Sequence, residues 1–108
     1  MKIDHISWKI PWRKIEFGAE IPALQNQLEL EVSNKHILWN KNAEVIGRRI
    51  DTDDVIVKTK DNLYVIVHLD YRTGPGNEEY PSTDVCKTLA EFILQMEEDS
   101  EDYGEEYS

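Results

Sequence analysis

The sequence predicts an α+β fold, in which a three-stranded antiparallel meander is flanked along the chain by two helices, and three observations support it. Apolar residues recur at steps of three and four before residue 33 and again after residue 84, which indicates amphipathic helices. Between these segments lie three runs rich in Val and Ile, joined by short polar links, as is typical of antiparallel strands. With 108 residues, 40% of them hydrophobic, the chain can form one core without metal or disulfide support.

The N-terminal segment alternates apolar and polar residues. Ile6, Trp8, Ile10 and Trp12 are separated by single residues, so we expect an extended arm with one buried face. Pro11 lacks an amide hydrogen, which makes this arm a candidate edge strand rather than a central one.

The first helix is expected over about residues 21–32. Pro22 suits a first helical turn, and Ile21, Leu24 and Leu28 fall on one face. The polar loop SNKHILWNKNA follows this helix.

Three strands should come next, at about residues 43–50, 54–60 and 63–70. The Asp-Asn pair at 61–62 is a candidate two-residue hairpin turn, since both residue types tolerate positive φ. Such a turn would set the register of two strands, with Thr59 opposite Tyr64. It would also place Val55 opposite His68.

The last helix is expected after the turn-rich loop 72–81. Ser82 or Thr83 can cap it through a hydroxyl oxygen that accepts from backbone N–H groups. A helical apolar stripe follows, formed by Val85, Leu89, Phe92, Ile93 and Met96.

The net charge of −10 is concentrated near the C-terminus. Seven of the 22 acidic residues lie in the last twelve positions, and without them residues 1–96 carry only −3. We therefore expect a single domain over 1–96 and an acidic, disordered tail over 97–108. An acidic surface repels nucleic acid and anionic membranes and favours a basic protein partner.

The predicted order of elements matches the double-stranded RNA-binding fold, but the charge argues against that function. Contacts with duplex phosphates need several basic residues at the start of the last helix, where Lys87 stands among acidic residues. No apolar stretch is long enough for a membrane span or a signal sequence, and the lone Cys86 has no internal disulfide partner. These features predict a cytoplasmic protein that binds neither nucleic acid nor membrane.

The stretch IGRRIDTDDVIV places two arginines and three aspartates between two apolar runs. The arginines, Arg48 and Arg49, should point to opposite faces of a strand. The aspartates are Asp51, Asp53 and Asp54. An arginine paired with one of them would either lock the hairpin or present a planar charged docking surface.

His68 and Asp70 lie two apart in the third predicted strand and so share a face. With the hairpin aspartates they form a candidate acid–base or metal cluster, or they simply close the end of the strand. No second nearby His or Cys completes a ligand set, and the aspartate-rich turn lacks the glycine and glutamate of an EF-hand loop. Trp39 is a candidate aromatic anchor for a partner. We assign no catalytic residue, metal or cofactor.

Four motifs within residues 20–71 resemble a group of small uncharacterised bacterial proteins. They are Ile21-Pro22-Ala23-Leu24, His36-Ile37-Leu38, Arg48 to Val55 and Ile66-Val67-His68-Leu69. The group carries an Ile-Pro-x-Leu helix, a His-x-Leu loop, an Arg-Arg-x-Asp-x-Asp-Asp-Val hairpin and a Val-Val-His-Leu strand. This chain departs from that pattern at Ile37, Ile66 and Asp70. The resemblance implies a shared fold and a bacterial, cytoplasmic setting, and it supplies no activity.

Small size, acidity and missing catalytic motifs favour a non-enzymatic protein-binding domain. Its sharpest version is an immunity protein that neutralises a basic toxin domain, since acidic inhibitors gain association rate through electrostatic steering. The alternative is a small hydrolase or metal-dependent enzyme that uses His68 and the aspartates, with Arg48 or Arg49 binding an anionic substrate. A third alternative is a homodimer that buries the arm containing Trp8 and Trp12.

Overall fold

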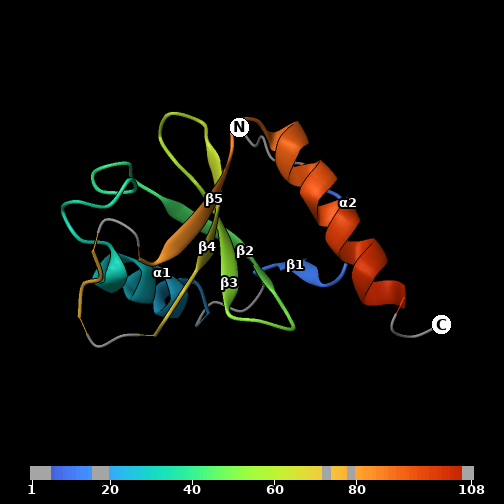
Figure 1. Cartoon of the computed structure of the whole chain (residues 1–108), viewed down its shortest axis with the longest axis horizontal. Coiled ribbons are helices and arrows are strands. Elements are labelled where there is room, and N and C mark those ends of the chain that lie inside the picture. Colours follow the sequence, from blue (N-terminus) through green and yellow to red (C-terminus); the bar gives the residue numbers. More distant parts are fainter. Residues whose placement is uncertain (1–5, 16–19, 72–73, 78–79, 106–108) are drawn as a thin grey trace.

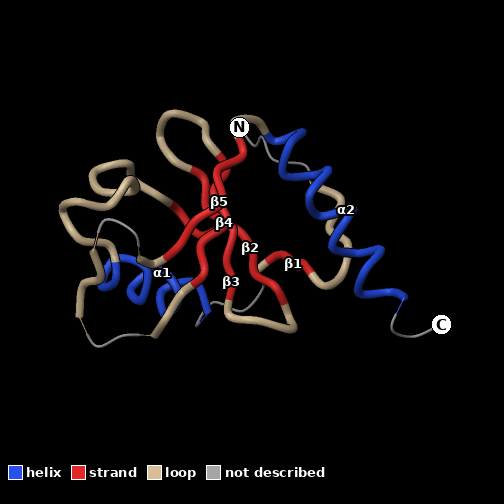
Figure 2. Tube along the Cα trace, viewed as in Figure 1, coloured by secondary structure: helices blue, strands red, loops and turns tan. Residues whose placement is uncertain are grey.

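The structure, a computed structural model of the chain, describes residues 6–15, 20–71, 74–77 and 80–105. Its elements are β1 (Trp12–Lys14), α1 (Glu20–Glu31), β2 (Glu44–Arg49), β3 (Asp54–Lys58), β4 (Tyr64–His68), β5 (Ser82–Cys86) and α2 (Leu89–Glu105). The five strands form one antiparallel sheet in the order β1-β2-β3-β4-β5. Figures 1 and 2 show α1 and α2 on opposite sides of this sheet.

The α+β class is confirmed, but the prediction of a three-stranded meander is wrong, because the sheet has five strands. One added strand is β1, which the N-terminal arm contributes beside β2. The other is β5, in the segment where we expected the last helix to begin. Its β-branched Thr83 and Val85 fit a strand better than a first helical turn. The helix begins instead at Leu89, where the Thr88 hydroxyl accepts from the Glu91 N–H at 3.2 Å.

The sheet is buried on both faces, because successive side chains of a strand point to opposite sides. On one face, valines of β3 and β4 pack against Leu24 and Leu28 of α1. On the other face, Ile56 and Ile66 pack with Phe92 of α2. Burying each such side chain stabilises the fold by about 1.5–3 kcal/mol, so both helices are needed to complete the core.

The β3–β4 hairpin differs from the predicted register by one residue. Residues 60–62 form a three-residue loop, in which the Thr59 N–H donates to the Leu63 carbonyl at 3.0 Å and Asn62 has a φ of 66°. A three-residue loop that ends in a left-handed residue is a common hairpin connection. The additional loop residue shifts every pair by one. His68 therefore lies opposite Asp54 and not opposite Val55.

The N-terminal arm packs against the chain itself. Trp12 is buried, and its ring meets the Phe92 ring edge to face at 5.4 Å. Trp8 lies so close to Gly47 of β2 that a Cβ at that position would be 2.4 Å from its ring. The arm thus packs within its own chain, and a homodimer that buries it stays a prediction.

Helix α2 runs past the expected domain boundary at residue 96 and ends at Glu105. Residues 97–105 are thus helical where we expected a disordered tail, and residues 106–108 lie outside the described part. Asp99 connects this helix to the sheet, since it accepts a hydrogen bond from Trp12 Nε1 at 2.9 Å and lies 3.3 Å from an Arg49 nitrogen. Within the described ranges, no helix has the length and apolar character needed to cross a membrane.

Candidate functional site

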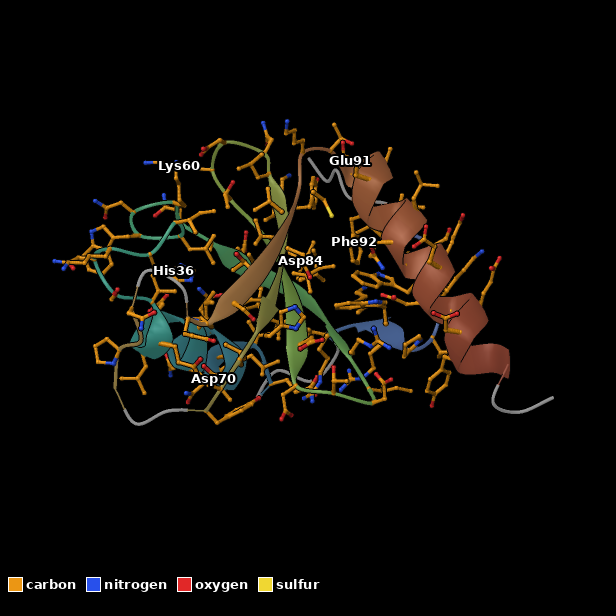
Figure 3. The ribbon with its side chains drawn as sticks, viewed as in Figure 1. His36, Lys60, Asp70, Asp84, Glu91 and Phe92 are labelled. Atoms are coloured by element: carbon orange, nitrogen blue, oxygen red, sulfur yellow. The ribbon has the colours of Figure 1, made fainter. Side chains whose placement is uncertain are left out.

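A groove of about 480 Å³ lies between α2 and the face of the sheet that α2 covers. Its charged lining comes from the four strands β2 to β5 and from the helix: Arg49, Asp54, His68, Asp84, Glu91 and Asp99. Figure 3 shows Asp84 on β5, and Glu91 and Phe92 on the neighbouring helix α2. Four carboxylates against one arginine and one histidine make the groove acidic.

His68 bridges two carboxylates at the sheet side of this groove. The observed register places it opposite Asp54, and its Nδ1 lies 2.7 Å from an Asp54 oxygen. Its Nε2 lies 3.2 Å from an oxygen of Asp84 on β5. A neutral imidazole donates from only one nitrogen, so both hydrogen bonds form only when the ring is protonated. Burial disfavours that charged form, but hydrogen bonds with Asp54 and Asp84 outweigh it and raise the pKa of His68.

The raised pKa of His68 predicts that folding stability falls as the pH rises. A group with a raised folded-state pKa stabilises the fold fully below its ordinary value of 6.5, and this stabilisation is lost as the pH rises through the folded-state pKa. The imidazole is 39% exposed, so screening should keep the effect below about 1 kcal/mol. Urea denaturation of wild type and His68→Gln across neutral pH measures it. The variant should lack this decline, and identical pH profiles would contradict the prediction.

Arg49 is held by contacts within the molecule. Two guanidinium nitrogens donate to the two carboxylate oxygens of Asp51, at 2.8 and 3.1 Å. The hydrogen bond from Arg49 lowers the pKa of Asp51 and keeps it charged. The guanidinium also lies 5.8 Å from the centre of the Trp12 ring and 3.3 Å from Asp99. Arg49 thereby joins the end of β2 to α2, which favours a structural role over binding an anionic substrate.

Arg48 points to the opposite face of the sheet from Arg49, as predicted. It lies 3.6 Å from a carboxylate oxygen of Glu20, at the start of α1. Arg13 donates to the same carboxylate, and this hydrogen bond lowers the pKa of Glu20. Arg48 is therefore on the α1 side of the sheet and contributes nothing to the groove.

The other predicted residues are dispersed. Asp51 and Asp53 are exposed in the turn between β2 and β3. Asp70 lies near α1 and apart from Asp84 (Figure 3), and its backbone N–H donates to Glu31 of that helix at 2.9 Å. Trp39 is 47% exposed and lines a second pocket of about 210 Å³ on the α1 side.

The proposed enzymatic cluster is thus only partly assembled. Arg49, Asp54 and His68 share one groove, whereas the other members of the cluster lie elsewhere. In the part of the chain that the structure describes, no set of three or more His, Cys, Asp or Glu residues is placed to hold a metal ion. Burial raises the pKa of the Cys86 thiol, the opposite of what a nucleophilic thiolate needs.

Sequence reasoning missed the groove residues that β5 and α2 supply. Asp84 fell within the expected last helix, and Asp99 fell within the expected tail. The sequence does hold one signal, because Thr88-x-x-Glu91 has the spacing of a capping box. In the structure the Glu91 carboxylate accepts from the Lys87 N–H at 2.8 Å. A helix start placed at Thr88 would have left Ser82–Cys86 available as a strand.

The resemblance to small bacterial proteins stays a prediction, and function has to be argued from the groove and its surroundings. A comparison with models of protein families finds no match, and comparisons with curated proteins and with solved structures find none either.

Proposed function

We propose that this chain is a non-enzymatic binding domain for a basic protein, and the acidic surface of α2 is the observation that carries the proposal. The helix has seven acidic residues and no lysine or arginine. Glu98, Glu101 and Asp102 are exposed and form no ion pair with any described residue. Uncompensated carboxylates on one helix attract a cationic surface and raise the rate of association with it.

An immunity protein that neutralises a basic toxin domain is the sharpest version of this proposal. The small size and the net charge of −10 support it, since an acidic inhibitor is steered electrostatically toward a basic toxin surface and associates with it faster. The enzymatic alternative has less support, because Arg49, Asp54 and His68 each have a charged partner within the chain.

The proposal predicts that two charges on α2 control affinity for the partner. The partner is first captured from the host with wild-type chain and then purified. Glu98→Gln with Glu101→Gln should weaken its binding about fivefold at low salt, because each exposed charge contributes roughly 0.5 kcal/mol. Titration calorimetry at two salt concentrations measures this, and the variant should also show a smaller salt dependence.

Glu29→Gln with Glu44→Gln is the matched control, since it removes two exposed carboxylates from α1 and β2. It should leave the affinity within about twofold of wild type. A partner held equally by all three proteins, or binding that does not respond to salt, would contradict the proposal. For the immunity version, the partner should be toxic when expressed alone and harmless when co-expressed with this chain.

A further inference from the structure

The sheet has an open edge at β5. This strand pairs with β4 on one side, and no strand among the described residues pairs with its other side. Residues 82–86 contain no proline or lysine, the residues with which many proteins block pairing at such edges. A five-residue edge strand presents backbone N–H and C=O groups to which an extended segment can add. The opposite edge, β1, has only three residues.

The two faces of β5 differ in chemistry. Asp84 lies on the face that α2 covers, where it borders the groove, and its side chain is 70% exposed. Val85 points to the other face and is 43% exposed. A strand added beside β5 would therefore meet a carboxylate on one face and an apolar side chain on the other.

The groove continues the acidic face of this edge toward α2. Asp84 of β5 and Glu91 of α2 both line it (Figure 3). The exposed Glu98 and Glu101 lie further along the same helix. A cationic side chain projecting from an added strand would enter a space bordered by carboxylates of both elements.

Charge argues against a second copy of this chain as the added strand. Antiparallel pairing of β5 with itself, centred on Asp84, would place two carboxylates directly opposite each other. It would also bring two acidic α2 helices to the same face of the joined sheet. Like charges in cross-strand positions are destabilising, so a basic segment fits this edge better than the chain itself.

We propose that β5 accepts an extended segment of a basic partner as a sixth strand, in which Lys or Arg alternates with apolar residues. The basic side chains face Asp84 and Glu91, and the apolar side chains cover Val85. Backbone hydrogen bonds supply affinity, and the alternation of side chains supplies specificity. The inference rests on the proposed function, because it names the part of the basic partner that docks and the element that receives it.

A peptide of alternating residues, acetyl-Lys-Val-Lys-Val-Lys-Val-Lys-amide, is the probe. In a strand, the N–H groups of alternate residues point to the same edge, so N-methylation of all lysines or of all valines blocks one edge at unchanged charge. With lysines facing α2, only one of these edges meets β5 when the peptide runs antiparallel to β5, the orientation of every strand pair in this sheet. We expect one methylated peptide to bind about tenfold more weakly than the parent, and the other to bind as the parent does. Titrations followed by NMR should place the largest amide shifts on β5.

The protein variants test the charged face of the same site. Asp84→Asn with Glu91→Gln keeps hydrogen-bond acceptors and should weaken the parent peptide about fivefold. Glu29→Gln with Glu44→Gln is the control and should not. Equal binding by both methylated peptides would overturn an antiparallel sixth strand, and a peptide methylated at all seven residues that binds as the parent does would overturn a sixth strand of either direction. In both cases the variants at Glu98 and Glu101 still test the acidic docking surface independently. Concentration-dependent dimerisation through β5 in light scattering would also overturn the sixth-strand inference, in favour of a second copy.

Discussion

Replacing Trp12 with alanine should lower the free energy of unfolding by about 3–5 kcal/mol. Its side chain is only 1% exposed and packs edge to face on Phe92 of α2. Its Nε1–H donates to Asp99, which is 87 positions away in the sequence. One residue thus attaches β1 to α2, and its removal would leave a cavity and would remove one of the two contacts of this Asp99 oxygen, the other being with Arg49.

Trp39→Ala is the matched control for Trp12→Ala, because it removes the same side chain from a site that is 47% exposed. It should change the unfolding free energy by less than about 1 kcal/mol. Trp12→Phe keeps a ring beside Phe92 but loses the donor to Asp99, so a loss of about 1–2 kcal/mol is expected. Urea denaturation followed by circular dichroism measures all three. Similar losses for the two alanine variants would show that Trp12 does not anchor α2.

Elements with a strong local pattern could be predicted from the sequence. The first helix was predicted over 21–32 and is Glu20–Glu31, and each of the three predicted strands contains the observed one. The spacing of apolar residues is enough to predict such elements. Each element buries one face, and the backbone geometry of a helix or strand sets how often a residue falls on that face.

The remaining parts of the fold depend on contacts between distant segments. β5 exists because β4 offers it an edge, and its sequence STDVC has too little apolar alternation to predict that pairing. The β3–β4 register depends on one loop residue, and the assumption of a two-residue turn shifted every pair. Because of that shift, the sequence did not predict that Asp54 lies opposite His68, a pair that lines the groove.

The candidate site was predictable only where partners are close in sequence. Arg49 pairs with Asp51 two positions away, as the hairpin charges suggested. The other partners of the two arginines, Asp99 and Glu20, come from the two helices. Ion pairs between distant segments form where the helices pack on the sheet. The sequence therefore could not predict that Arg48 contacts α1 whereas Arg49 contacts α2.

Replacing Glu31 with alanine should destabilise the fold by about 3–4 kcal/mol. Glu31 is fully buried at the end of α1. Its carboxylate accepts from the backbone N–H of Asp70 at 2.9 Å and of Tyr71 at 2.6 Å, and from Gln27 Nε2 at 2.6 Å. Its own carbonyl accepts from the Gly76 N–H at 2.8 Å. Alanine would leave two backbone donors, in the loop that connects β4 to β5, without this acceptor.

Glu31→Gln separates hydrogen bonding from mere side-chain volume. The two backbone donors meet different carboxylate oxygens, so either orientation of a glutamine amide directs its NH2 group at one N–H group. We expect a loss of about 2 kcal/mol, between wild type and alanine. Glu29→Gln, on an exposed position of the same helix, should stay within about 0.5 kcal/mol of wild type. Denaturation midpoints provide the comparison, and a Glu31→Gln variant as stable as wild type would mean that volume alone matters at this position. If the loss is as expected, the loop leading to β5 depends on one buried carboxylate, and so does the placement of the edge at which we expect the partner to bind.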